Sequence, residues 1–316
     1  MRAIAVEEFG QPPRLMVLPR PVPGPEEILV RLEAGSPNPF DRAICEGFLR
    51  DLPHVFPLVL GTDGAGIVEA TGERVKRFAV GDAVYGIFAH EPLGKGTLAE
   101  YVAAPEDVWV AKAPQRISLR QAAAAPTAGM TALGIVRKAD IQPGQTVLIV
   151  GATGGVGSFA VQLAAARGAR VIATARRNAA ELVLRLGASS AVDYERDSLA
   201  DGVSAVEPNG VDLLLDLVSD PIAFEANAEL VHDGGAAISI RYAAAPDAPY
   251  SSRIDAVNFN LRDHPDGLRL LAELTDEIES GSVNVVVDEE VLLENAPGFL
   301  SSRALGGARG KAVIAV

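Results

Sequence analysis

A glycine-rich turn between an apolar strand and a helix is the segment of this sequence best suited to chemistry. It reads VLIVGATGGVG at 147–157. Glycine at 154 would let the backbone approach a pyrophosphate group, and glycine at 157 would let the helix lie close to the strand. The start of that helix offers unpaired N–H groups and partial positive charge to phosphate. The pattern predicts a dinucleotide site made of Ala152, Thr153, Gly154, Gly155, Val156 and Gly157.

The second strand of this unit ends in residues that favour NADPH over NADH. Sites for NADH usually place Asp or Glu there, and the carboxylate binds the ribose 2′-hydroxyl. Guanidinium groups suit a 2′-phosphate instead, because their planar fork matches its oxygens. We therefore expect NADPH, the alternative being that the two arginines only cover the start of the next helix. The residues concerned are Thr174, Ala175, Arg176 and Arg177.

Metal and thiol chemistry have little support in the residue types. Cys45 is the single cysteine, which excludes an intrachain disulfide framework and a cysteine-rich metal site. No base near it in the sequence would activate a thiol nucleophile. The histidines show no ligand spacing, and we predict no metal site. They are His54, His90, His232 and His264.

Two kinds of element must position these residues. Residues 1–110 read as short strands separated by Pro and Gly clusters, which is typical of a compact β-rich domain. The cluster SPNPFD at 36–41 reads as a turn. From about residue 142, apolar strands alternate with helices, which predicts a doubly wound α/β unit with a parallel sheet. Its strands are expected at 146–150, 170–175, 191–193, 211–217, 236–240 and 256–261, and its helices at 155–167, 179–186 and 221–230.

The tail returns to strand character after a helix at 265–280. A strand is expected at 283–291, a helix at 292–305 and an apolar strand at 312–316. This segment should pack on the β-rich domain, so that the nucleotide unit is inserted between two parts of it.

The composition excludes several classes of function. The formal net charge of −13 argues against nucleic acid, which needs a basic face. The N-terminus has no basic region followed by an apolar one, so we expect no signal peptide. No apolar run is long enough to span a bilayer. We expect a protein without membrane partners in the cytoplasm.

The order of motifs along the whole chain resembles the medium-chain dehydrogenase/reductase superfamily, in its zinc-independent quinone oxidoreductase branch. Such a series in fixed order is far more specific than one glycine loop. The motifs are NPFDRAICEGF at 38–48, LVLGTDGAGIVEATGERVKRFAVGDAVYG at 58–86, GTLAEYVAAPED at 96–107, AAAAPTAGMTALGIV at 122–136, GATGGVG at 151–157 and GGARGKAVIAV at 306–316.

The resemblance implies a two-domain α/β fold. A GroES-like β-rich catalytic domain would comprise 1–121 plus 262–316, and a Rossmann NADPH-binding domain would comprise 122–261. Zinc-dependent members have a His-Glu pair where this sequence has Thr62–Asp63, and a Cys where it has Thr127. The family pattern therefore also implies no metal.

The resemblance also implies roles for individual residues. Asn38 and Asp41 match a turn at the active-site mouth, where Asn38 either hydrogen-bonds the acceptor or the ribose, or only stabilises the turn. Thr127 matches a threonine near the nicotinamide, and with Asn38 and Asp41 it forms the candidate catalytic set. Further cofactor contacts are implied for Tyr194, Val218, Ser239, Ile240 and Arg241.

These residues imply NADPH-dependent reduction of a quinone or an α,β-unsaturated carbonyl by hydride transfer without zinc. The alternatives are an enoyl-thioester reductase and a non-catalytic NADPH-binding regulatory protein. The family implies a homodimer. The sequence departs from the family at the bulky pair Arg241–Tyr242, where many relatives have small residues. The resemblance therefore does not identify the acceptor. The apolar lining of the acceptor pocket is expected from Phe40, Phe48, Leu93 and Tyr242.

Overall fold

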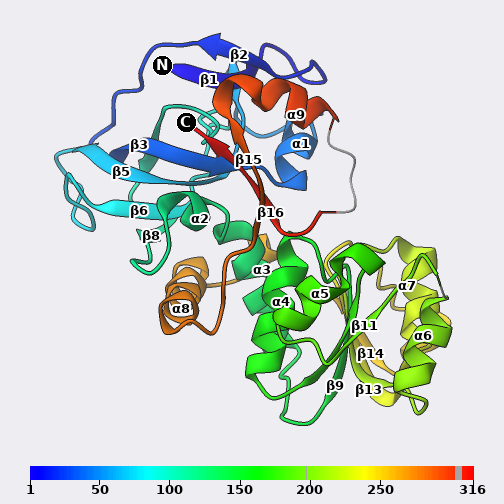
Figure 1. The fold of residues 1–316 in the computed structure, drawn as a ribbon. Helices are drawn as coiled ribbons and strands as arrows, with labels where there is room; N and C mark the ends of the chain where they lie inside the picture. Colours follow the sequence, from blue (N-terminus) through cyan, green and yellow to red (C-terminus); the bar gives the residue numbers. More distant parts are fainter. Residues whose placement is uncertain (197, 303–307) are drawn as a thin grey trace.

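The computed structural model describes residues 1–196, 198–302 and 308–316. Figure 1 shows two units, with both marked chain ends in the same one. Its main sheet has the strand order β15-β16-β3-β5-β6-β8 with β7 on β3, and a smaller sheet β2-β1-β4 lies beside it. All pairs in these two sheets are antiparallel except β15 with β16, which are parallel. The strands are β1 Arg2–Val6, β2 Arg14–Val17, β3 Glu27–Ser36, β4 Leu58–Val59, β5 Asp63–Thr71, β6 Ala83–Ile87, β7 Tyr101–Pro105, β8 Trp109–Lys112, β15 Val287–Leu292 and β16 Lys311–Ala315.

The second unit is a parallel sheet with the strand order β11-β10-β9-β12-β13-β14. From β9 the chain adds β10 and β11 on one side, and it then adds β12, β13 and β14 on the other side of β9. Open sheets of this kind bind ligands at the carboxyl ends of the strands beside the point where the strand order reverses. The ends of β9, β12 and β13 are therefore the place to look for a cofactor site. The strands are β9 Thr146–Val150, β10 Arg170–Thr174, β11 Ser190–Val192, β12 Val211–Asp216, β13 Val231–Ser239 and β14 Asp255–Asn258.

Helices connect and cover these sheets. In the described residues α4 to α7 follow successive parallel strands, while α3 and α8 pack together at the junction of the two units. The helices are α1 Pro39–Cys45, α2 Leu119–Ala123, α3 Pro126–Lys138, α4 Gly155–Ala166, α5 Ala180–Arg185, α6 Leu199–Val206, α7 Pro221–Ala228, α8 Gly267–Ser280 and α9 Ala296–Ser302, with 3-10 turns η1 Arg177–Ala179, η2 Pro249–Ser252, η3 Leu261–Asp263 and η4 Leu293–Asn295.

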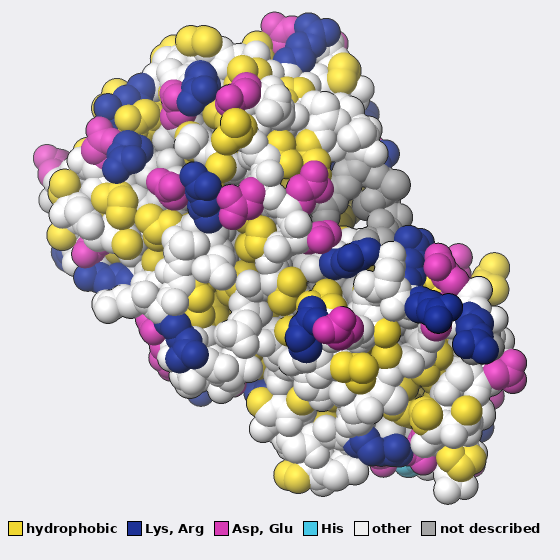
Figure 2. Space-filling model, in the orientation of Figure 1, with side chains coloured by type: hydrophobic (Ala, Val, Ile, Leu, Met, Phe, Trp, Pro, Cys, Tyr) yellow, Lys and Arg dark blue, Asp and Glu magenta, His cyan; other side chains and the backbone are white. Residues whose placement is uncertain are grey.

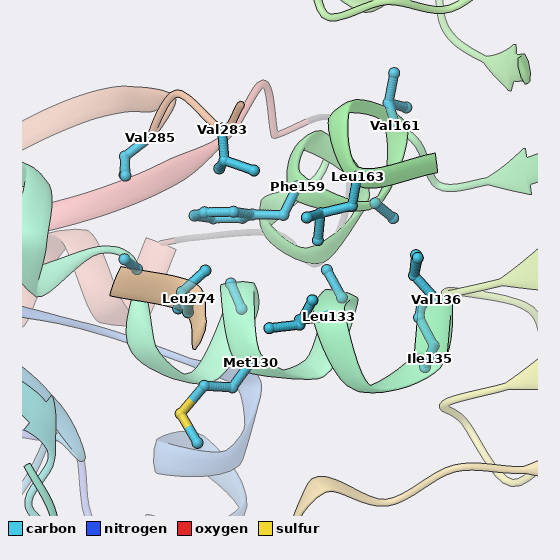
Figure 3. Close-up of a cluster of buried hydrophobic side chains, with 14 of the residues drawn as sticks. Met130, Leu133, Ile135, Val136, Phe159, Val161, Leu163, Leu274, Val283 and Val285 are labelled. Atoms are coloured by element: carbon cyan, nitrogen blue, oxygen red, sulfur yellow. The ribbon is translucent and has the colours of Figure 1, made fainter. Parts of the chain in front are cut away.

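The largest apolar core lies between α3, α4 and α8 (Figure 3). Phe159 of α4 and Leu274 of α8 are fully buried against α3. A side chain at Gly129 of α3 would meet Leu274 at 2.7 Å, so glycine lets the two helices approach. Burial of each large apolar side chain stabilises the fold by about 1.5–3 kcal/mol. The same helices that carry candidate site residues are thus held rigidly.

The predicted fold class, a β-rich domain joined to a doubly wound parallel sheet, is confirmed. The turn predicted at 36–41 is wrong in part, because Asn38 caps α1, which begins at Pro39. Within the first 110 residues the apolar runs predict strands at 2–6, 27–34, 66–70, 83–88 and 99–103, so β2, β4 and β8 were not predicted, and neither was the helix α6. The tail strand begins later than expected, at Val287, and α9 occupies the middle of the helix predicted at 292–305.

The end of that predicted helix and the start of the 306–316 motif lie outside the described residues. The domain boundaries at 121/122 and 261/262 remain a prediction. In the described part of the chain, we find no helix with the length and apolar character needed to cross a bilayer.

Candidate active site

The turn from β9 to α4 has the shape that a pyrophosphate needs. The backbone N–H of Gly151 donates to Thr174 Oγ1 at 2.9 Å, which ties the turn to β10. A Cβ at Gly157 would lie 2.2 Å from the carbonyl oxygen of Gly151, so only glycine lets α4 sit this close to the strand. A Cβ at Gly154 would meet nothing nearer than 3.5 Å, so this side of the turn faces open space. The residues therefore fit a dinucleotide at the start of α4.

The neighbouring residues of the turn divide into two groups. Ala152 is fully buried, whereas residues 153–156 are partly exposed at the start of the helix. Thr174 and Ala175 are buried. The Thr174 hydroxyl accepts a hydrogen bond from the turn and does not face the space outside it. The structure brings Thr153, Gly154, Gly155 and Val156 to the accessible side.

Cationic and phenolic groups meet at the end of β10. The exposed Arg176 donates from Nε to the Tyr194 hydroxyl at 3.2 Å and pairs with Glu195 at 3.0 Å. Arg177 is also exposed and opens η1. Figure 2 shows Lys and Arg side chains on the part of the parallel-sheet unit that faces the other unit. A guanidinium and a phenol in contact suit a phosphate monoester, because both donate hydrogen bonds.

The ends of β12 and β13 form the other side of the predicted cofactor site. Val218 is 59% exposed, and the buried Asp216 accepts from the N–H groups of Val218 and Ser219 at 3.2 and 2.9 Å. This carboxylate was not predicted, although it lies within the apolar run VDLLLDLV and ends β12. It fixes the loop that presents Val218.

The segment after β13 is held by a serine. The hydroxyl of the buried Ser239 accepts from the N–H groups of Arg241 and Ala243, both at 3.1 Å. Ile240 is partly buried, and Arg241 is exposed. Tyr242 has a left-handed backbone with φ of 58° and is 60% exposed, an unusual conformation for a bulky residue. Both bulky side chains thus lie outside the core.

Asn38 lies in a network in the antiparallel unit that uses both ends of its amide. Its Nδ2 donates to Asp63 Oδ2 at 3.0 Å, and its Oδ1 accepts from Lys311 Nζ at 2.5 Å. The same ammonium donates to the carbonyl oxygen of Pro37 at 3.0 Å. Because these protein partners occupy the amide, the geometry favours the structural alternative for Asn38.

Thr127 joins this network from α3. Its N–H donates to Asp63 Oδ2 at 3.1 Å and its hydroxyl donates to Asp63 Oδ1 at 2.6 Å. In the stretch 122–136 every residue is buried except Thr127, which is partly exposed. A hydroxyl whose proton is given to Asp63 is left to accept hydrogen bonds from a ligand.

Asp41 is the second buried carboxyl group of the network. Its Oδ2 accepts from the N–H of Asn38 at 2.6 Å, and its Oδ1 has no hydrogen-bond partner among the described residues. Burial raises the pKa of Asp41 to about 7, against the effects of the Asn38 N–H, of Lys311 and of the nearby Thr62 hydroxyl. Burial also raises the pKa of Asp63, while Lys311 and the hydrogen bonds from Thr127 and Asn38 oppose that rise.

A pocket opens beside Asp41 and Thr62. Leu93, His90 and Lys95 line its other side, so one of the residues expected in the acceptor pocket is found there. Phe48 is 69% exposed and Phe40 packs near the Arg262 guanidinium, 5.7 Å from its ring centre. Neither of them, nor Tyr242, lines this pocket.

The sequence predicts that Asn38, Asp41 and Thr127 belong to one catalytic site. It predicts no role in that site for Asp63 or Lys311. Lys311 could have been noticed as a lysine opening an apolar strand, which must be buried if the strand is. Among residues 1–196, 198–302 and 308–316, no group of three or more His, Cys, Asp or Glu side chains could hold a metal ion.

Comparisons with known proteins agree with this geometry. Residues 24–115 match the model of the alcohol dehydrogenase GroES-like domain, and residues 155–257 match the zinc-binding dehydrogenase model. The chloroplast envelope quinone oxidoreductase homolog of Arabidopsis thaliana is 32% identical over 94% of this chain and 92% of its own length. The 2-methylene-furan-3-one reductase of Solanum lycopersicum is 32% identical over 92% of this chain and 71% of its own.

A mycobacterial structure complexed with NADPH has a TM-score of 0.84 at 28% identity, and the match covers 100% of both chains. The fold, the glycine turn and the end-to-end matches therefore lead to one conclusion. This chain belongs to the medium-chain dehydrogenase/reductase superfamily, in its quinone oxidoreductase branch, and is an oxidoreductase.

Proposed function

We propose that this protein transfers hydride from NADPH to a quinone or to an α,β-unsaturated carbonyl compound, without zinc. Relatives named as a quinone oxidoreductase homolog and as a 2-methylene-furan-3-one reductase support this class of acceptor. The structural neighbour solved with NADPH supports the choice of cofactor.

The zinc-free proposal depends on the hydrogen bonds that Asp63 already accepts within the protein. Three N–H and O–H groups from Asn38 and Thr127 donate to its two oxygens, and the Lys311 ammonium acts on it electrostatically. A second cation beside that ammonium would be repelled, and the described residues offer no further ligands. Without a Lewis acid an alcohol is poorly activated, so acceptors that are already electron-poor fit the site better.

The chain's own residues bind and orient the cofactor in this proposal. Gly154 and the start of α4 would hold the pyrophosphate, and Arg176 with Tyr194 would hold the 2′-phosphate. Thr127 would accept a hydrogen bond from the nicotinamide end, since Asp63 takes its hydroxyl proton. When bound, reduced nicotinamide supplies a hydride to an electron-poor carbon. The protein contributes the alignment of the two reactants and the exclusion of water.

The test is cofactor oxidation, followed by absorbance, against a panel of quinones and enones with NADPH and with NADH. We expect turnover that prefers NADPH and that survives treatment with a metal chelator. Loss of activity on chelation would contradict the zinc-free mechanism. Binding of NADPH without turnover of any acceptor would favour a regulatory protein.

The proposal includes a homodimer in the cytoplasm. Sedimentation equilibrium of the purified chain measures its mass in solution, and a monomer over the whole concentration range would contradict the dimer. Fractionation of cells that express the chain would test the location.

A further inference from the structure

If the proposed function holds, the site must also deliver a proton. Hydride transfer to an enone or a quinone leaves the electron pair on an oxygen of the acceptor, as an enolate or a hydroquinone anion. General acids in enzymes supply that proton in the same site. The site described above contains two buried carboxyl groups, and the question is which of them can hold a proton at neutral pH.

The count of buried charges requires one such proton. Asp41 is 5% exposed, Asp63 is not exposed and Lys311 is 6% exposed. One ammonium compensates one carboxylate, and a second ionised carboxylate in the same place would be an uncompensated buried charge. Lys95 at the edge of the pocket pairs with Glu27 instead, at 3.8 Å. Two carboxyl groups that share one buried cation therefore retain a proton between them.

The hydrogen bonds decide which carboxyl group keeps it. Asp63 accepts two N–H groups at Oδ2 and one hydroxyl at Oδ1, and these donors stabilise its anion. Asp41 accepts one N–H at Oδ2, and the Thr62 hydroxyl makes a smaller contribution that lowers its pKa, while its buried Oδ1 has no hydrogen-bond partner among the described residues. An orphaned carboxyl oxygen is the better place for a proton, because ionisation there gains no hydrogen bond.

Asp41 also borders a pocket of about 30 Å³, which is room for a single water. It lines the pocket with Thr62, His90, Leu93 and Lys95. We propose that Asp41 is the general acid that protonates the reduced acceptor through a water in this pocket. Asp63, paired with Lys311, is then the positioning residue that fixes Thr127 and Asn38.

The groups around Asp41 explain the pKa of this carboxyl group. Next to α1, Asn38 donates its N–H, from β5 Asp63 contributes a like charge, and from β16 Lys311 contributes an opposite charge. The loop after β6 brings His90 and Lys95 to the same pocket. Burial outweighs the attractive groups and places the pKa of Asp41 at about 7, close to the operating pH of a general acid.

The step balances as follows. The hydride carries two electrons from reduced nicotinamide to a carbon of the acceptor, and the acceptor oxygen becomes an anion. The O–H bond of the Asp41 carboxylic acid breaks, and its proton passes to the water in the pocket. That water gives one of its own protons to the acceptor oxygen, where the new O–H bond forms. The Asp41 carboxylate remains beside the Lys311 ammonium, and water that enters through the pocket restores the proton before the next turnover.

The test is Asp41→Asn in the full chain, with Asp82→Asn as the matched control. Asn resembles the protonated acid in shape and charge but cannot release a proton at neutral pH. Asp82 is a partly exposed residue in the loop before β6 that accepts from the Ala79 N–H and pairs with Lys112. Thermal unfolding and NADPH binding verify that each variant folds.

For the wild-type chain we expect kcat at saturating substrates to fall as the pH rises above about 7, because the acid is lost. In D41N we expect kcat to be about a hundredfold lower, this alkaline fall to vanish and the isotope effect of deuterated NADPH to shrink. D82N should keep the wild-type profile. These changes would not follow from a purely structural role of Asp41.

Two failures are distinguishable. A wild-type chain that reduces no quinone or enone overturns the proposed function itself. A wild-type chain that turns over while D41N matches its rate and pH profile overturns only the role of Asp41. A carbon-13 spectrum of labelled aspartates adds a readout that does not need turnover: a carboxyl signal that titrates near neutrality and is absent in D41N supports the assignment, and its absence from the wild type contradicts it.

Discussion

Asp41 couples the folding of this protein to pH in the opposite sense from most aspartates. Its pKa in the folded chain is about 7, against 3.8 for an ordinary aspartate, so the folded state holds a proton that the unfolded state has lost between these values. Stability contributed by that proton is present at low pH and is lost as the pH rises through this window.

We therefore predict that D41N flattens the fall in stability between about pH 4 and about pH 7. The urea midpoint measured across this range, relative to the wild-type chain, checks it. D82N serves as a contrast, because the Ala79 N–H and Lys112 lower the pKa of Asp82 and its carboxylate favours the folded state as pH rises. A D41N chain with the full wild-type slope would contradict the buried-acid description.

In the proposed function, Arg176 is the residue on which the choice of cofactor depends. Its guanidinium is exposed beside Tyr194 and is held by Glu195 at 3.0 Å. Replacement by Gln should raise KM for NADPH about tenfold or more, because a charge-assisted hydrogen bond contributes about 1.5–3 kcal/mol. KM for NADH should change little. Steady-state kinetics with both cofactors measure this, and Arg185→Gln, at an exposed arginine of α5 that pairs with Glu181, is the control. An equal effect on NADH would indicate general damage to the site.

At the scale of the element, the β9–α4 turn contains two glycines with different expected roles, one in folding and one in cofactor binding. A methyl group at Gly157 collides with the backbone of Gly151 and Ala152, whereas at Gly154 it enters open space. We predict that Gly157→Ala lowers stability by about 1–3 kcal/mol, in the range of overpacked sites. Gly154→Ala should fold normally and bind NADPH at least about tenfold more weakly, because the methyl group occupies the space of the pyrophosphate. Chemical unfolding and cofactor titration of the pair decide it, and normal NADPH binding by G154A would remove the pyrophosphate from this turn.

The elements differ in how well the sequence could predict them. The strand, turn and helix of 146–167 follow from apolar runs and glycine spacing, which are local properties. Helix α1 was missed because the sequence signals of a turn and of a helix N-terminus look alike: Asn38 and Pro39 suit both, and packing of Ile44 in the core decides. The partner of Lys311 could not be predicted, because Asn38 is 273 residues away in the chain.

At the scale of the whole molecule, α8 connects the antiparallel sheet to the core of the junction. The buried Tyr85 of β6 forms a hydrogen bond with Thr275 Oγ1 at 2.8 Å and donates to the carbonyl oxygen of Leu271 at 3.3 Å. Helix α8 also packs on α3 and β8. A side chain at Gly267 would meet the Trp109 ring at 2.0 Å, so the contact is close along the helix.

Because the junction is continuous, we predict one cooperative unfolding transition. Tyr85→Phe removes the hydroxyl and should lower the free energy of unfolding by about 1 kcal/mol, with the transition still single. Calorimetry and denaturant titration followed by two probes measure both features. Two separate transitions in the wild-type chain would show that the junction does not couple the units.

The position of Lys311 on β16 also sets an order of events during synthesis on the ribosome. The parallel sheet is made from residues 146–258 and can be translated in full before β16 emerges. The ammonium that compensates Asp41 and Asp63 arrives later, across a loop that encloses the entire nucleotide unit. Closing so long a loop is entropically easier once the residues within it are compact. A nascent chain can therefore fold its parallel-sheet unit first, and the network of Asn38, Asp63 and Lys311 is completed only when β16 pairs with β3.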